Sequence, residues 1–191
     1  HRPNLGNYEG RCPSMMLRNP HPNAGAIDAL GDEQHALIEA YLNRSRKYVN
    51  TRDSEQAVAA LDEAIQLFPD DTYVRRTSAL VLNKQAWTLA TDPDSKRWDA
   101  VNAITFAERA VELSPGEGFI WNTLGVARYR ADQWHEAIEA LEKSISLQGD
   151  NSLDWFFLAM AHQRLGHEEE ARRWYDQAVE WMKKHNPDIW N

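Results

Sequence analysis

Two segments of the chain repeat one another at a fixed offset. Trp121, Leu124 and Ala137 are matched by the residues 34 positions later, which are Trp155, Leu158 and Ala171, and further positions match in size class. A fixed period of about 34 residues is typical of stacked helix–turn–helix units, because one such unit cannot bury its apolar face alone. The period therefore predicts an all-helical array.

Two earlier stretches carry the same spacing of small residues, each followed by a proline. They are Ala57, Leu61, Ala64 and Pro69, and Ala103, Ala107, Ala110 and Pro115. The chain thus divides into four units, at residues 38–71, 72–117, 118–151 and 152–185. Unit 2 has 46 residues, 12 more than the others, and we place the excess in the turn-rich run 91–95, between its two helices.

These residues resemble the tetratricopeptide repeat family, whose pattern is an aromatic residue, Leu-Gly, Tyr, and then Ala, an aromatic or Leu, Ala and Pro. The positions that carry the resemblance are Trp121, Leu124, Gly125, Ala137, Leu141 and Ser144 in unit 3, and Trp155, Leu158, Ala159, Ala171, Tyr175 and Ala178 in unit 4. Unit 1 is looser, with Arg44 where leucine is usual. The resemblance, closest to bacterial modules of the family, implies a right-handed solenoid that acts as a non-catalytic scaffold for protein binding.

Local signals place several helix ends. Asp53 with Gln56 three residues later fits a capping box, and Asp71, Ser95 and Ser152 are further N-cap candidates. Pro69 and Pro115 are expected to end the second helices of units 1 and 2.

Residues 1–34 differ from the repeats in composition. They hold half of the chain's eight prolines, together with several glycines, and show little helical periodicity. We expect residues 1–34 to form an extended, non-helical arm, with a disordered terminus as the alternative. The repeat domain then covers residues 35–185, and residues 186–191 form a short tail.

In the family, the first helix of each unit lines the concave face of the array. The resemblance therefore implies a partner-binding groove made by Arg46, Asn50, Tyr73, Arg76, Asn83, Lys84, Asn122, Tyr129, Arg130, Phe156, Met160 and Arg164. These residues include five cations and no carboxylate, although the net charge of the chain is −8, which favours an acidic peptide or protein segment. The alternative is that the cations near helix C-termini only favour the helix dipole.

A second hypothesis is self-assembly. Only six residues follow unit 4, so no capping helix fits there, and Trp181, Ile189 and Trp190 could cover the end of the array by contact with another copy. Together with the arm, this predicts a head-to-tail homo-oligomer or filament.

Other classes of function find little support. We see no catalytic motif, expect no cofactor, and expect no metal site from the seven histidines, although His162 and His167 lie five residues apart across a turn. The negative charge argues against nucleic acid, and no apolar run reaches the length of a transmembrane helix. The absence of an initiator methionine at His1 favours an exported protein, periplasmic or extracellular, in a bacterium.

Overall fold

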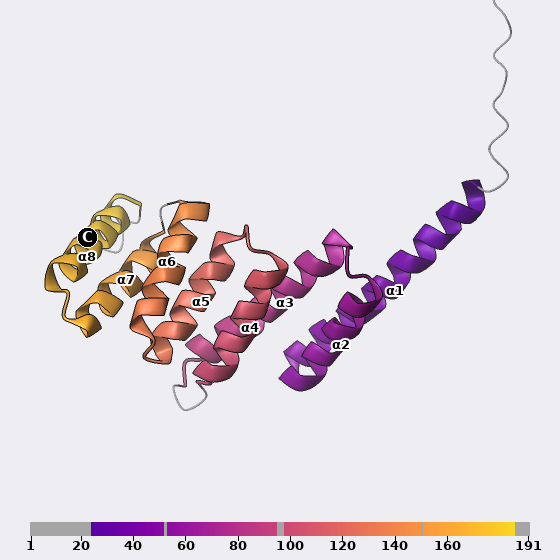
Figure 1. Ribbon diagram of the computed structural model, residues 1–191, viewed down its shortest axis with the longest axis horizontal. Coiled ribbons are helices and arrows are strands. Elements are labelled where there is room, and N and C mark those ends of the chain that lie inside the picture. The colour runs from indigo at the N-terminus through magenta and orange to yellow at the C-terminus, as the bar shows by residue number, and fades with distance from the viewer. Residues whose placement is uncertain (1–23, 52, 95–97, 150, 186–191) are drawn as a thin grey trace, which may run out of the picture. The chain divides into compact units, whose positions relative to one another are not determined.

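The structure is a computed structural model that describes residues 24–51, 53–94, 98–149 and 151–185. Within these ranges it contains helices and no strands, which confirms the all-helical prediction (Figure 1). The helices are α1 (Ala24–Asn50), α2 (Ser54–Leu67), α3 (Thr72–Thr91), α4 (Ala100–Leu113), α5 (Gly118–Arg130), α6 (Trp134–Gln148), α7 (Ser152–Leu165) and α8 (Glu168–His185).

The extended-arm prediction is wrong for residues 24–34, because α1 already begins at Ala24. Gly25 and Gly31 each cost a helix only about 1 kcal/mol relative to alanine, and the Ala, Leu, Glu and Gln residues between Ala24 and Leu37 favour it. Residues 1–23 and the tail at 186–191 lie outside the described residues. The described chain divides after Leu37, and the part from Ile38 onward holds the repeats.

Units 2, 3 and 4 are helical hairpins, and the second helix of a hairpin also packs against the next first helix, as α4 does on α5 and α6 on α7. The first helices also touch one another, since α5 packs against both α3 and α7. Between α4 and α6 we find at most marginal contact among the described residues. The first helices therefore form the more closely packed layer, as expected for the inner face of a solenoid.

Small residues allow this close packing. Gly125 of α5 lies so near α6 that a Cβ atom placed on it would be 2.6 Å from Leu141 Cγ. Ala137 on α6 is fully buried, and so are the corresponding Ala57 of α2 and Ala103 of α4. The repeat spacing therefore marks the points where helices approach most closely.

Most of the predicted helix ends agree with the structure. The Asp53 carboxylate accepts a hydrogen bond from the backbone N–H of Gln56 at 3.1 Å, and α2 and α4 each end two residues before their proline. Ser152 was the wrong cap for α7, because the side chain of Asn151 accepts from the N–H of Leu153. Ser95 lies outside the described residues, and the cap of α4 is Asp99.

The extra residues of unit 2 are not confined to a loop. Helix α3 has 20 residues, whereas α5 has 13 and α7 has 14, so part of the insertion extends α3 as far as Thr91. The rest forms the connection to α4, where the indole N–H of Trp98 donates to the carbonyl of Asp92 at 2.8 Å. The turn-forming residues at 91–95 correctly predict the connection between the two helices. They do not predict that part of the insertion lies before them, in the longer helix α3.

We expect the Asp71→Ala variant to lose about 1 kcal/mol of unfolding free energy. The Asp71 carboxylate caps α3 by accepting from the backbone N–H groups of Tyr73 and Val74 at 2.8 and 3.0 Å. Urea unfolding followed by circular dichroism measures the loss. The exposed neighbour Asp70 provides the control, and an equal loss in Asp70→Ala would contradict the capping role.

Candidate protein-interaction surface

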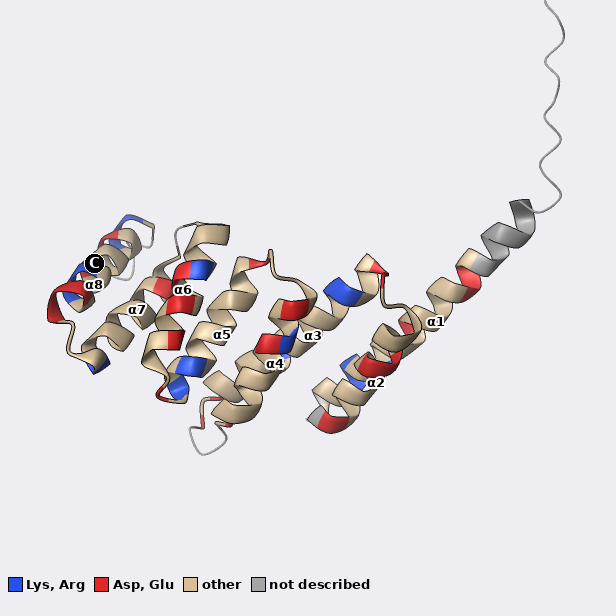
Figure 2. Ribbon diagram, viewed as in Figure 1, with Lys and Arg blue, Asp and Glu red and all other residues tan. Residues whose placement is uncertain are grey.

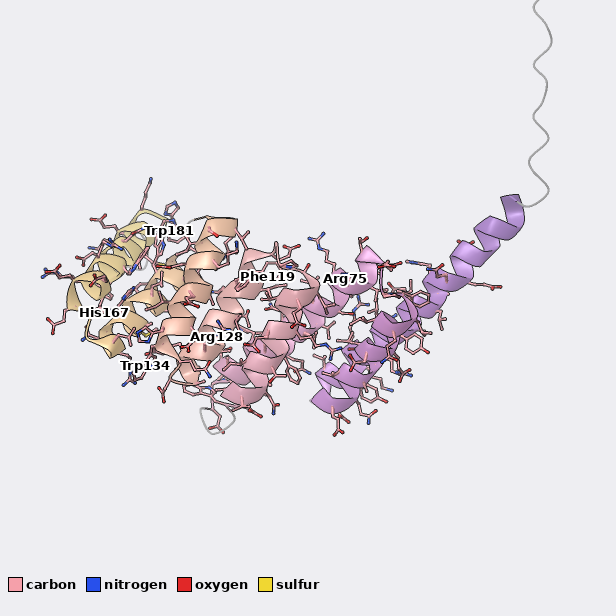
Figure 3. The ribbon with its side chains drawn as sticks, in the orientation of Figure 1. Arg75, Phe119, Arg128, Trp134, His167 and Trp181 are labelled. Atoms are coloured by element: carbon pink, nitrogen blue, oxygen red, sulfur yellow. The ribbon has the colours of Figure 1, made fainter. Side chains whose placement is uncertain are left out.

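A row of large apolar side chains is exposed on the first helices. Their exposed fractions lie between 37% and 44%, and they are Tyr73 and Leu80 of α3, Phe119 of α5, and Leu153 and Met160 of α7. All occupy the second or ninth position of their unit, which are about two helical turns apart and so lie on one side of the helix. We call these five residues the first-helix face; Figure 3 labels Phe119 at the start of α5.

The structure brings some of the predicted groove residues together. Arg46 and Val49 of α1 and Val81 and Lys84 of α3 line a cavity of about 170 Å³. A larger cavity, of about 470 Å³, lies against α7 and α8 and is lined by Tyr129, Phe156, Met160 and Arg164, with six other residues. The predicted groove residues thus line two separate cavities.

Other predicted groove residues hold neighbouring units together. Asn122 is buried and donates its amide to the carboxylate of Asp154. The guanidinium of Arg130 lies 3.9 Å from the centre of the Trp98 ring, in the connection of the preceding unit.

Arg164 repeats this arrangement, 5.9 Å from the Trp134 ring of α6. In both cases the thirteenth residue of a unit contacts a tryptophan close to the start of the preceding second helix. Such cation–π contacts contribute about 0.5–1 kcal/mol at exposed sites.

The first-helix face is less cationic than the sequence suggested. Arg46 lies 3.6 Å from Glu39, and Arg76 lies 3.1 Å from Glu117, so carboxylates do stand beside the face. The prediction missed both because Glu39 is the unconsidered second residue of unit 1 and Glu117 precedes α5. In Figure 2, acidic and basic residues are interspersed along the helices.

The remaining predicted residues are placed as follows. The Tyr73 hydroxyl donates to Glu39, and Asn83 is half-buried on α3. The Trp181 ring stacks on that of His185 with centroids 4.1 Å apart. Ile189, Trp190 and the side chain of Asn50 lie outside what the structure describes.

Asp154 is a buried carboxylate that the sequence analysis overlooked. It accepts hydrogen bonds from the side chains of Asn122, Ser144 and Gln148, which belong to the preceding unit. Burial raises the pKa of Asp154, and the three hydrogen bonds oppose this effect. The signal was present in the repeat alignment, since Ile120 occupies the equivalent place in unit 3.

His162 and His167 meet across the turn between α7 and α8, with their Nδ1 atoms 3.2 Å apart. Burial is the main cause that lowers the pKa of His162, and the nearby His167 lowers it further. The tautomers of the two rings decide which Nδ1 donates in this contact. In the described residues, no three side chains of His, Cys, Asp or Glu converge to hold a metal ion, and no helix could span a membrane.

Comparison with known proteins identifies the repeats. Family models described as "Tetratricopeptide repeat" match residues 38–71 and 152–185, the bounds predicted for units 1 and 4. The human PEX5-related protein is 30% identical over 92 residues, which are 48% of this chain and 14% of that protein. The Saccharomyces cerevisiae small glutamine-rich tetratricopeptide repeat-containing protein 2 is 28% identical over 122 residues, 64% of this chain and 32% of that protein. The chain thus spans a third or less of either relative.

Solved structures share the fold. MamA from Desulfovibrio magneticus RS-1 has a TM-score of 0.57 at 19% identity, over 78% of this chain and 77% of that one. The structure of MamA AMB-1 has a TM-score of 0.58 at 18% identity, over 80% and 76% of the two chains. The chain therefore carries tetratricopeptide repeats at residues 38–71 and 152–185, in an all-helical scaffold of the kind that mediates protein interactions.

Proposed function

We propose that the chain is a non-catalytic scaffold whose first-helix face binds a segment of another protein. The observation that carries this proposal is the row of exposed apolar side chains on α3, α5 and α7. Apolar side chains gathered on one face of a folded protein mark interaction sites, and aromatic residues supply much of the binding energy there. Tyr73 and Phe119 are the aromatic members.

Two features beside the face suggest the chemistry of the ligand. Arg46 and Lys84 line the smaller cavity, so a carboxylate of the ligand would find two cations there. The larger cavity presents Phe156, Met160 and Tyr175, which suit an apolar side chain. A segment with an acidic residue near one end and apolar residues along its length fits this arrangement.

A library of random 15-residue peptides, displayed on phage and selected on the chain, tests the proposal. We expect a selected peptide to bind about tenfold more weakly to a variant with Phe119→Ser and Leu153→Ser, because both substitutions remove exposed apolar contacts. Fluorescence anisotropy with the labelled peptide measures the affinity.

Val101→Ser is the matched control. Val101 is 73% exposed and lies on α4, in the other layer of helices, so it presents apolar surface away from the first-helix face. Circular dichroism confirms that each variant is folded. If Val101→Ser weakened binding as much as the double variant did, the ligand would not lie on the first-helix face.

A further inference from the structure

Two histidines meet at the turn between α7 and α8 and present a pair of ring nitrogens. His162 lies near the end of α7 and His167 directly before α8, and their Nδ1 atoms are 3.2 Å apart. Figure 3 labels His167 at this turn. Two histidines on one helix share a metal ion when they lie four residues apart, whereas five residues suffice here because the chain reverses between them. Spacing along a helix therefore does not reveal this pair.

The backbone of the turn holds the two histidines together. The N–H of His167 donates to the carbonyl of His162 at 2.9 Å, and Gly166 between them is left-handed, with a φ of 79°. This arrangement is a common end for a helix, and it favours glycine at the left-handed position. Unit 3 has the same bond, from the N–H of Gln133 to the carbonyl of Arg128 at 3.0 Å. The turn is thus a regular part of the array, which places the two side chains in advance of any ligand.

The separation of the two Nδ1 atoms fits a tetrahedral metal ion. Zn²⁺ binds histidine nitrogen at about 2.0–2.1 Å, which puts two such nitrogens about 3.3–3.4 Å apart at the tetrahedral angle. Neighbouring ligands of a square-planar ion, the geometry typical of Cu²⁺ and Ni²⁺, would lie about 2.9 Å apart at the same bond length. The observed 3.2 Å is closer to the tetrahedral value, so the pair fits Zn²⁺ best.

The charges around the pair also suit a cation. Glu170 of α8 and Glu142 of α6 both act on His162 through their negative charge, and Arg173 opposes them. Burial, the largest cause, lowers the pKa of His162, and His167 lowers it further, so this ring is neutral at neutral pH, as a metal ligand must be. Each Nδ1 offers its lone pair to a metal when the proton of that ring is on Nε2.

The two rings would stay accessible if another repeat followed. In unit 3, which unit 4 follows, the equivalent residues are Arg128 and Gln133, and Gln133 is exposed while Arg128 is partly exposed. Arg128 contacts Glu108 of α4, so this position is directed toward the preceding unit and not toward the next one. The accessibility of the histidine pair is therefore a property of the turn.

We propose that His162 and His167 bind Zn²⁺ through their Nδ1 atoms, with water completing the tetrahedron. Among the described residues, no third side chain of His, Cys, Asp or Glu joins them in a ligand set, so two positions stay open to water. The proposal does not depend on the first-helix face, and it assigns a site that the sequence analysis did not expect. Bound zinc would link the end of α7 to the start of α8.

Isothermal titration of the untagged full chain with zinc chloride, after removal of metal with EDTA and dialysis, tests the site. We expect the unsubstituted chain to bind one equivalent that the double variant with His162→Gln and His167→Gln lacks. Any zinc bound elsewhere is the same in both proteins, so the difference reports on the pair. Each single variant should bind this equivalent about tenfold more weakly or worse, because losing a group that only orients a ligand already costs about 10–100-fold.

His135→Gln is the matched control. His135 is exposed on α6, and its replacement removes one histidine of the repeats without touching the pair. Its zinc binding should equal that of the unsubstituted chain, and circular dichroism shows whether each variant is folded. Glutamine at position 167 is the residue that unit 3 has at the same turn, so His167→Gln should fold normally. Equal zinc binding by the unsubstituted chain and the double variant, or no binding by either, would overturn the proposal.

Urea unfolding gives a second readout. Because zinc bound by both histidines stabilises only the folded turn, saturating zinc should raise the urea midpoint of the unsubstituted chain, and excess EDTA should reverse the increase. The double variant should show no increase; an equal increase in both proteins would place the zinc elsewhere and overturn the assignment. Binding of selected peptides to the first-helix face can be measured in EDTA, so the two proposals fail separately.

Discussion

Replacing Gly125 by leucine should lower the free energy of unfolding by about 3 kcal/mol. A Cβ atom at Gly125 would lie 2.6 and 2.8 Å from Cγ and Cδ2 of Leu141. Leu141 is fully buried in the core cluster that also contains Trp155 and Leu158, so it has no free space into which to move. The favourable effect of leucine on helix propensity, about 1 kcal/mol, is smaller than the cost of separating α5 from α6. Urea unfolding followed by circular dichroism measures the difference.

The same substitution at Gly116 is the matched control. Gly116 is exposed in the turn before α5, and nothing lies within 4 Å of where its Cβ would be. We expect Gly116→Leu to unfold within about 0.5 kcal/mol of the unsubstituted chain. Adding Leu141→Ala to Gly125→Leu should restore part of the stability, because it removes the atoms in conflict. Equal urea midpoints for the Gly125 and Gly116 variants would show that α5 and α6 are not in close contact.

The array could be predicted from sequence because its rule is local. Close approach requires small residues at fixed places, such as Gly125 and Ala137, and each unit repeats the requirement at the same spacing. The start of α1 could not be read in this way. Taken alone, Gly25 and Gly31 indicate turns. The helix forms because the helix-favouring residues around them outweigh the small helix-propensity cost of each glycine, and counting glycines and prolines does not show this.

The candidate surface was only partly predictable for a related reason. Family position placed Arg130 in the groove, but the ring beneath its guanidinium belongs to Trp98, in an insertion that the family pattern does not contain. The partner of Arg46, Glu39, lies seven residues earlier on the same helix, outside the residues considered in unit 1. Spacing predicts which helix a side chain occupies, whereas its contacts depend on the neighbouring unit.

We expect Asp154→Ala to cost about 3 kcal/mol of unfolding free energy. The substitution leaves Asn122 and Gln148 without their acceptor, and hydrogen bonds to charged groups contribute about 1.5–3 kcal/mol each. Part of this loss is offset because the variant no longer has to bury a carboxylate. Asp154→Asn should cost less, about 2 kcal/mol, because its amide oxygen still accepts on one side although its NH2 group faces a donor on the other. Urea unfolding at pH 7 measures both, with Glu139→Ala on the exposed side of α6 as the control.

The stability contributed by Asp154 should also depend on pH in a direction set by its burial. Because burial raises its pKa in the folded chain, the folded state holds the proton more readily than the unfolded state does. This favours folding most below the unfolded pKa of about 4, and the advantage is lost as the pH rises through the folded pKa. Asp154→Asn does not ionise, so the stability of the unsubstituted chain relative to this variant should fall as the pH rises from about 4 through the raised pKa of Asp154. Urea unfolding of both proteins across that range tests the sign. A relative stability that rises with pH would mean that the three hydrogen bonds outweigh burial and hold the pKa of Asp154 below its ordinary value.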